Sequence, residues 1–124
     1  MEIKKITIAG AGTMGYSMAE IFARNGYDVI LWNHKAPTLE RAKTKIAPDM
    51  VDKITYTTDS SAFKGRDLIV ETIVENLDTK LDFYRTYSPL AGDDTIIATN
   101  TSGLSINALS KAVVKPERFL GMHW

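Results

Sequence analysis

The chain contains no cysteine, which excludes disulfides, thiolate chemistry and cysteine-ligated metal sites. It also lacks any apolar run near the ~20 residues that a membrane-spanning helix requires. Its fifteen basic residues balance fifteen acidic ones, so no net field draws it to nucleic acid or to anionic membranes. The residues from Met1 to Lys5 are not followed by the long apolar core of a secretory signal. We therefore expect a cytoplasmic protein with no metal, nucleic-acid or membrane partner.

The composition is that of an ordinary folded protein. Of the 124 residues, 44 % are hydrophobic and 24 % are charged, which is typical of globular domains and not of disordered chains. The length suits one compact domain with a genuine core. Since no internal repeat, low-complexity segment or linker interrupts the chain, we expect residues 1–124 to form a single domain.

Short apolar runs alternate with amphipathic stretches along the whole chain. The expected strands are Ile3 to Ala9, Asp28 to Trp32, Ile54 to Thr58, Asp67 to Ile73, Thr95 to Asn100 and Phe119 to Trp124. The expected helices run from Thr13 to a stop at Asn25-Gly26, from Thr38 to Ile46, from Asp78 to about Tyr87 and from Ser105 to Ala112. This alternation predicts an α/β fold with a doubly wound parallel sheet. We predict the strand order 3-2-1-4-5-6, with or without a well-formed sixth strand.

The first strand ends in the sequence Gly10-Ala11-Gly12-Thr13-Met14-Gly15. A glycine pattern of this kind is weak evidence by itself, but here it lies between a strand and a helix, the context that gives it meaning. Gly10 permits a tight turn, Gly12 lets the backbone approach a pyrophosphate, and Gly15 lets the helix pack closely. Amides at the helix start face the anion. The motif predicts dinucleotide binding at Gly10, Gly12, Thr13, Met14 and Gly15; the alternative is a plain turn without a ligand.

The residue that closes the second strand bears on which dinucleotide binds. An acid at this position would bond the adenosine ribose 2′-hydroxyl of NAD, but this chain has Asn33, followed by His34 and Lys35. Asparagine can still bond a ribose hydroxyl, although it does not repel a 2′-phosphate, and Lys35 could attract one. Alternatively, His34 and Lys35 are solvated loop residues. The residues alone therefore leave NAD and NADP both open.

Six segments in order resemble the N-terminal NAD-binding domain of the 3-hydroxyacyl-CoA dehydrogenase family. They are the glycine motif from Gly10 to Gly15, Asp67 to Glu71, Val74 to Leu77, Lys80, Ala98 to Ser102, and Pro116 to His123. Many dehydrogenases share a glycine motif, whereas the Val-Glu-Asn-Leu, Asn-Thr-Ser and Pro-Glu-Arg-Phe-x-Gly-x-His segments together are specific. The resemblance implies a Rossmann fold, NAD as cofactor and a role in fatty acid metabolism.

The resemblance also implies roles for individual residues. Glu75 and Lys80 match residues at the nicotinamide end of the cofactor site, and Asn100 lies near the nicotinamide and the catalytic histidine. Ser102 matches the serine that holds the substrate's 3-oxygen. His123 matches the general base that takes the proton of the 3-hydroxyl while hydride leaves for NAD. From bare chemistry, the first pair could be a solvated ion pair, Asn100 and Ser102 could cap turns, and His123 could be a packed strand residue.

The chain also departs from the family's pattern. It stops at Trp124, before the family's aromatic-Asn-Pro segment, the glutamate that orients the histidine, and the helical C-terminal domain that closes over the substrate and forms most of the dimer contact. The stretch from Asn33 to Thr58 is also shorter than the hairpin that helps to hold coenzyme A. A base without its orienting acid loses control of tautomer and geometry. We therefore expect cofactor binding with little or no turnover from this chain alone.

Three functions are compatible with these observations. The chain is the cofactor half of a 3-hydroxyacyl-CoA dehydrogenase that needs the missing helical domain, in cis or in trans, and can form a homodimer. Alternatively, it is a non-catalytic dinucleotide-binding module. A β-hydroxyacid dehydrogenase-like fragment is a third reading, suggested by Gly12-x-Met14-Gly15-x-x-Met18-Ala19 and by Trp32-Asn33. This third reading does not explain the Asn-Thr-Ser and Gly-Met-His segments.

Overall fold

A computed structural model describes residues 2–100, 106–113 and 116–121. Its strands are β1 (Lys5–Ala9), β2 (Asp28–Trp32), β3 (Ile54–Thr57), β4 (Leu68–Glu71), β5 (Ile96–Thr99) and β6 (Phe119–Gly121). Its α-helices are α1 (Thr13–Arg24), α2 (Ala36–Lys43), α3 (Leu77–Tyr87) and α4 (Ile106–Ser110). Short 3₁₀ turns are η1 (Val51–Lys53), η2 (Ser60–Phe63), η3 (Ser88–Leu90) and η4 (Pro116–Arg118).

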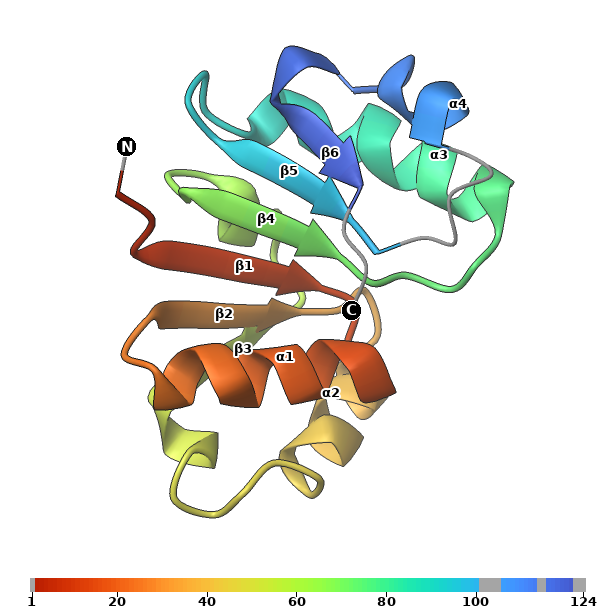
Figure 1. Ribbon diagram of the computed structural model, residues 1–124. Helices are drawn as coiled ribbons and strands as arrows, with labels where there is room; N and C mark the ends of the chain where they lie inside the picture. The colour runs from red at the N-terminus through yellow and green to blue at the C-terminus, as the bar shows by residue number, and fades with distance from the viewer. Residues whose placement is uncertain (1, 101–105, 114–115, 122–124) are drawn as a thin grey trace.

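The strands form one parallel sheet in the order β3-β2-β1-β4-β5-β6, which confirms the predicted topology. Because all strands run the same way, their carboxyl ends lie at one edge of the sheet (Figure 1). Ala9 pairs with Trp32 on one side and with Glu71 on the other, so the glycine turn that follows β1 begins between the ends of β2 and β4. This is the switch point where such sheets bind ligands.

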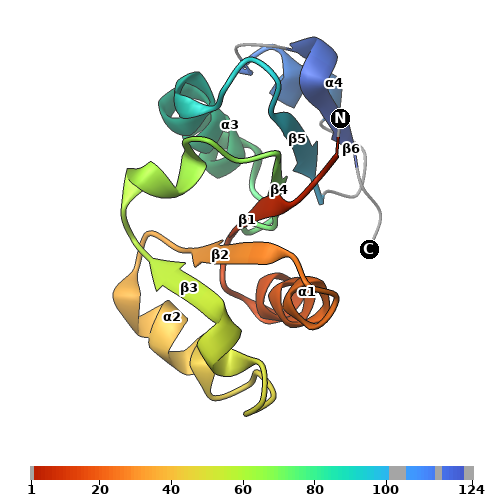
Figure 2. The same ribbon diagram turned by 90° about the vertical axis from the view of Figure 1, so that its left-hand side faces the viewer.

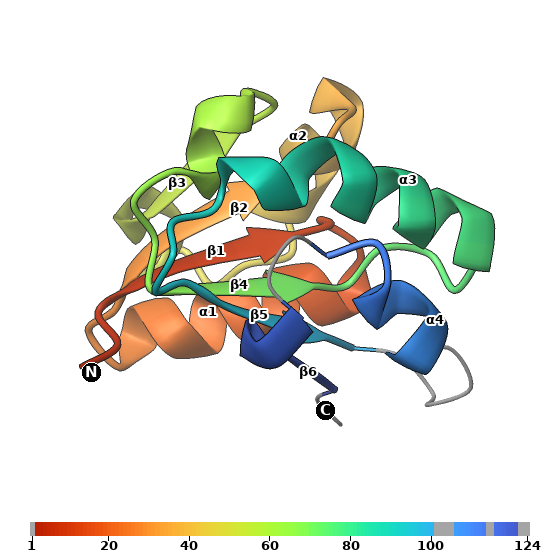
Figure 3. The same ribbon diagram turned by 90° about the horizontal axis from the view of Figure 1, so that it is seen from above.

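Two apolar clusters cover the two faces of the sheet. Ile6 and Ile8 of β1 belong to a cluster that includes residues of α1 and α2, such as Met18 and Leu39. Ala9 belongs to the opposite cluster, which contains residues of η2, α3 and α4. Figure 3 shows α1 and α3 on opposite sides of the sheet. Successive residues of β1 from Ile6 to Ala9 are all buried, as expected for a strand that is covered on both faces.

Proline and glycine set the boundaries around β2. Helix α2 begins at Ala36 and not at the predicted Thr38, because Pro37 is accommodated in its first turn, where no amide donor is needed. It ends at Lys43, earlier than the predicted Ile46. Helix α1 ends as predicted, with Gly26 at φ +90°. Figure 2 shows α2 beside β3 at one end of the twisted sheet, with β5 and β6 at the other.

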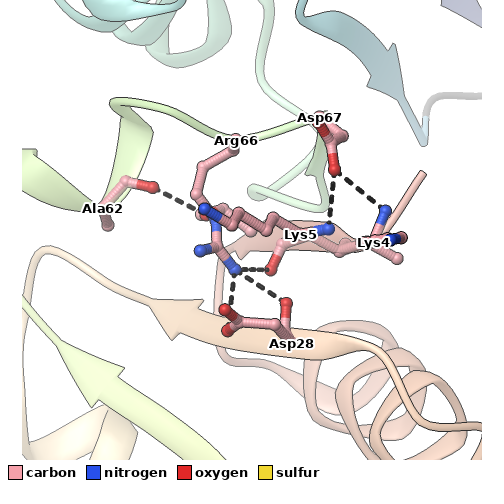
Figure 4. A network of polar contacts seen from close by, with 8 residues as sticks. Lys4, Lys5, Asp28, Ala62, Arg66 and Asp67 are labelled. Carbon is pink, nitrogen blue, oxygen red and sulfur yellow. Dashed lines mark hydrogen bonds and ion pairs between the residues drawn. The ribbon is translucent and has the colours of Figure 1, made fainter. Parts of the chain in front are cut away.

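The amino edge of the sheet is held by polar contacts (Figure 4). The buried Arg66 guanidinium donates to the carbonyl oxygens of Ile6 and Asp28 at 3.0 and 2.7 Å. The Asp67 carboxylate accepts the amides of Lys4 and Lys5, both at 2.9 Å. These bonds join β1, β2 and the segment before β4 at the edge opposite the carboxyl ends. None of the helices in the described part of the chain has both the length and the apolar composition that a membrane span requires.

Candidate nucleotide-binding site

The glycine turn is tight at both of its ends. Gly10 has φ +110°, a conformation that side chains rarely tolerate, and its amide donates to the Trp32 carbonyl at 2.8 Å. A Cβ at Gly15 would lie 1.7 Å from the Gly10 carbonyl oxygen. The Thr72 hydroxyl, from the loop after β4, bonds that same oxygen at 2.9 Å. Gly10 and Gly15 are therefore required by the packing of β1, α1 and the loop after β4.

Gly12 differs from these two glycines. It is exposed, its φ is an ordinary −74°, and an added Cβ would meet no described atom within 4 Å. Neither backbone strain nor packing calls for glycine here. Gly12 precedes Thr13, the first residue of α1, whose helix start presents amides toward the same space. The open backbone is what a pyrophosphate needs in order to approach closely.

Asn33 lies beside this turn, although its amide group is already engaged. Its Oδ1 accepts the Ala11 amide at 3.1 Å, and its Nδ2 donates to the Lys35 carbonyl at 3.1 Å. The residue is buried. Asn33 thus ties the end of β2 to the glycine turn and shapes the loop before α2, a structural task that the sequence analysis did not foresee. His34 and Lys35 are exposed on that loop.

A pocket of about 240 Å³ opens on the other side of the β2 end. Its lining comes from Trp32, His34, the loop residue Ile73, and α3, including Phe83 and Tyr87. The Trp32 indole is packed among Phe63, Phe83 and Tyr87. Trp32 Nε1 is buried and has no hydrogen-bond partner among the described residues. A pocket lined by aromatic side chains suits a flat heterocycle.

A buried ionic cluster supports the carboxyl ends of β4 and β5. The Glu71 carboxylate accepts four hydrogen bonds: from Lys80 Nζ at 2.6 Å, the Ile73 amide at 2.7 Å, the Tyr84 hydroxyl at 2.9 Å and the Thr99 hydroxyl at 2.5 Å. Glu71, Lys80, Tyr84 and Thr99 have no solvent exposure. Burial, and then the Glu71 charge, raise the pKa of Tyr84 well above its usual value, so its hydroxyl remains a donor.

The residues predicted at the nicotinamide end differ in their exposure to solvent. Glu75 is exposed on the loop before α3, whereas Lys80 is fully buried against Glu71. The alternative of a solvated Glu75–Lys80 pair is wrong, because Glu71 takes the ammonium group into the interior. Asn100 directly follows β5, and its backbone amide donates to the backbone carbonyl of Glu71 at 2.8 Å. Asn100 and Glu75 therefore extend from the same carboxyl edge.

Two of the predicted site residues, Ser102 and His123, lie outside the described residues, so their roles stay predictions. The sequence did not lead us to predict Thr72 or the roles of Trp32 and Glu71. An acid that closes an otherwise apolar strand is a signal that could have drawn attention to Glu71, since a buried carboxylate requires partners. Within the described ranges, no three His, Cys, Asp or Glu residues are grouped to hold a metal.

A doubly wound parallel sheet with an open glycine turn at its switch point defines a dinucleotide-binding domain of the Rossmann type. Residues 5–52 and 45–124 match the family model described as 3-hydroxyacyl-CoA dehydrogenase, NAD binding domain. The chain belongs to this family, and NAD is its cofactor.

Curated relatives are similar over nearly the whole chain. A 5-formyl-3-hydroxy-2-methylpyridine 4-carboxylate 5-dehydrogenase of Mesorhizobium japonicum is 37 % identical over 98 % of this chain and 44 % of its own length. A probable 3-hydroxybutyryl-CoA dehydrogenase of Deinococcus radiodurans is 35 % identical over 97 % of this chain and 49 % of its own. The chain thus spans about half the length of the relatives it matches.

Solved structures show the same fold. A 3-hydroxyacyl-CoA dehydrogenase from Archaeoglobus fulgidus superimposes with a TM-score of 0.89 and 31 % identity, over 98 % of this chain and 42 % of that one. A diketoreductase superimposes with a TM-score of 0.93 and 28 % identity, over 100 % of this chain and 50 % of that one. The matched half carries the sheet and the glycine turn.

Proposed function

We propose that this chain is the cofactor-binding half of a 3-hydroxyacyl-CoA dehydrogenase, with the NAD pyrophosphate held against the amides of Gly12 to Gly15. The carrying observation is Gly12, a glycine that neither strain nor packing requires and that leaves the backbone open in front of α1. A glycine that neither the backbone conformation nor the packing requires suits close approach by a ligand. The pyrophosphate is the part of NAD that suits such a turn.

The surroundings of the turn fit the rest of the cofactor. The adenosine ribose lies next to Asn33 in this proposal, and the adenine enters the aromatic pocket beside Trp32 and His34. The nicotinamide end extends toward Asn100 and Glu75 at the ends of β5 and β4. We propose an indirect role for Lys80: buried against Glu71, it fixes the loop that carries Glu75.

The chemistry proposed for the site is reversible oxidation of a 3-hydroxyacyl-CoA, for which the bound nicotinamide supplies the hydride acceptor. His123 takes the proton of the 3-hydroxyl, and its near-neutral unperturbed pKa suits that task. Ser102 holds the 3-oxygen, and Asn100 orients the reacting groups. Support comes from the family membership and from the position of Asn100 at the cofactor edge.

Turnover is proposed to need the region that the longer relatives have in addition. This chain spans 44 % and 49 % of two relatives, and in this proposal the orienting glutamate and the closing helical domain belong to the remaining region. Without them the base is not held, and water remains around the reacting atoms. The alternative, a module that binds the dinucleotide and catalyses nothing, makes the same binding prediction and differs only in the second experiment below.

The first experiment measures NADH binding to the chain by calorimetry, before and after Gly12→Val. We expect the variant to lose binding, because a branched side chain fills the space in front of the turn, while its circular dichroism and melting stay close to those of the parent. Gly26→Asn is the control: this position is also open, but it lies at the far end of α1. Unchanged NADH affinity in Gly12→Val would remove the proposal.

The second experiment tests catalysis with 3-hydroxybutyryl-CoA and NAD. The chain alone should show no more than trace turnover, and adding the C-terminal region of a relative, fused or as a separate chain, should restore it. His123→Gln should then abolish the restored activity without changing NADH affinity. Strong activity from the 124 residues alone contradicts the need for the second region. Restored activity that survives His123→Gln contradicts the assignment of the base.

A further inference from the structure

A second pocket borders the glycine turn, on the side away from the aromatic pocket. It has a volume of about 170 Å³ and lies between the start of α1 and one side of α2. Its lining includes Gly12, Thr13, Tyr16, Thr38, Arg41 and Lys45. The pocket is therefore continuous with the open backbone at Gly12, where the proposed function places the pyrophosphate.

The charge of this pocket is positive. Arg41 and Lys45 line it, and no acidic residue does. Within the part of the chain that the structure describes, neither cation takes part in an ion pair. The acids of the neighbouring helices are engaged elsewhere, since Glu40 pairs with Lys43 at 2.7 Å and Glu20 accepts the Ala47 amide at 2.7 Å. Two unpaired cations in one concavity leave a site for an anion.

The neighbouring end of β2 lacks the charge that would oppose such an anion. Asn33 stands where a carboxylate would bond the ribose diol and repel a 2′-phosphate. Its side chain is neutral, and it is bonded to the Ala11 amide on the rim of the pocket. The exposed Lys35 adds a third cation on the loop between Asn33 and α2. An anion in this pocket is therefore attracted by the cations and is not repelled by a carboxylate at position 33.

We propose that this pocket binds the 2′-phosphate of NADP, so that the chain accepts NADP in addition to NAD. This inference rests on the proposed function, because the ribose reaches the pocket only if the pyrophosphate lies on the glycine turn. Arg41 supplies a planar donor group that suits a phosphate, and Lys45 adds a point charge. Thr13, Tyr16 and Thr38 line the same pocket, and a hydroxyl group can donate to a phosphate oxygen.

The test compares the dissociation constants of NADH and NADPH, measured by cofactor fluorescence at fixed ionic strength. Arg41→Gln is expected to weaken NADPH binding about tenfold and to leave NADH binding within about twofold, since hydrogen bonds to charged groups contribute on this scale. Lys45→Gln should act in the same direction. Lys43→Gln is the matched control: Lys43 lies on the same helix but pairs with Glu40 and does not line the pocket. The thermal melt of each variant checks its fold.

Each other outcome has a defined meaning. An equal loss of NADH and NADPH affinity in Arg41→Gln assigns the cations to the pyrophosphate and overturns the inference. No change in either affinity overturns it as well. If the parent chain binds NADH but not NADPH, the inference fails while the proposed function stands. If the parent chain binds neither dinucleotide, both fail.

A last arm separates the two sources of a ribose phosphate. Adenosine 2′,5′-bisphosphate represents NADP, and adenosine 3′,5′-bisphosphate represents the nucleotide of coenzyme A. We expect the 2′,5′ compound to displace NADH more strongly from the parent chain, and we expect Arg41→Gln to remove this advantage. Stronger displacement by the 3′,5′ compound would assign the pocket to coenzyme A and overturn the inference.

Discussion

Gly12 and Gly15 belong to the same turn, yet a side chain would meet different surroundings at each. The Cβ of an alanine at 15 would collide with the Gly10 carbonyl, whereas the Cβ of an alanine at 12 would meet open space. We predict that Gly15→Ala lowers the free energy of unfolding by about 3 kcal/mol or more, the upper end of the usual cost of overpacking. Gly12→Ala should change it far less. Urea denaturation measures both; equal losses would show that the two glycines have the same task.

Asn33 both holds the loop before α2 and, in our proposal, lies next to the adenosine ribose. Its Nδ2 donates to the Lys35 carbonyl, and Asn33→Asp replaces this donor with an oxygen that repels the carbonyl. We therefore expect some loss of stability, together with a shift of cofactor preference toward NADH, because a carboxylate repels a 2′-phosphate. The ratio of NADH to NADPH dissociation constants checks the second effect, with Asn33→Ser as a neutral control. A ratio that does not move places Asn33 away from the ribose.

At the element scale, helix α3 is attached to the sheet through Lys80 and Tyr84, which both reach Glu71. Lys80→Met leaves the buried carboxylate without its countercharge, so we predict a loss of about 3–5 kcal/mol in the free energy of unfolding. The double variant Glu71→Gln/Lys80→Met should lose less than the sum of the two single variants. Lys43→Met, which breaks a surface pair with Glu40 and a cation–π contact with Tyr56, should cost no more than about 2 kcal/mol.

The strands and helices were predictable from the sequence pattern, whereas the partners of buried polar side chains were not. The strand-helix alternation predicted the topology because parallel strands buried on both faces are continuous apolar runs. The burial of Lys80 was not predicted, because charged side chains are expected at surfaces. Nothing in the neighbouring sequence indicates that the Glu71 carboxylate accepts the Lys80 ammonium group in the interior. The Asn33 side chain accepts a hydrogen bond from the Ala11 amide, and the pairing of β1 with β2 brings these two residues together. Long-range partners decide which polar residues face a ligand and which face the core.

At the scale of the whole molecule, the two edges of the sheet have different tasks. The amino edge is closed by Arg66 and Asp67, while the carboxyl edge carries the open turn and both pockets. Hydrogen bonds from the Lys4 and Lys5 amides lower the pKa of Asp67 below its ordinary value. A lowered pKa means that the ionised form stabilises the fold above about pH 4, the unfolded value, and that this contribution is lost as pH falls below it.

Asp67→Asn should therefore destabilise the chain near neutral pH and matter less in acid. We expect the urea midpoints of the parent and the variant to differ at pH 7 and to approach each other at pH 3. Binding of NADH at neutral pH should be unaffected, because Asp67 lies at the edge opposite the glycine turn. A gap between the midpoints that is as large at pH 3 as at pH 7 contradicts a role for the Asp67 charge.

Amide NMR of the chain titrated with NAD shows whether the dinucleotide lies on the turn between β1 and α1. We expect the largest chemical-shift changes at the amides of Gly12, Thr13 and Met14, followed by residues around Trp32 and Ile73 in the aromatic pocket. The amide signals of Lys4, Lys5 and Asp67 at the amino edge should not shift. Changes concentrated at that amino edge, or absent from Gly12 to Met14 at saturating NAD, would show that NAD does not bind on this turn.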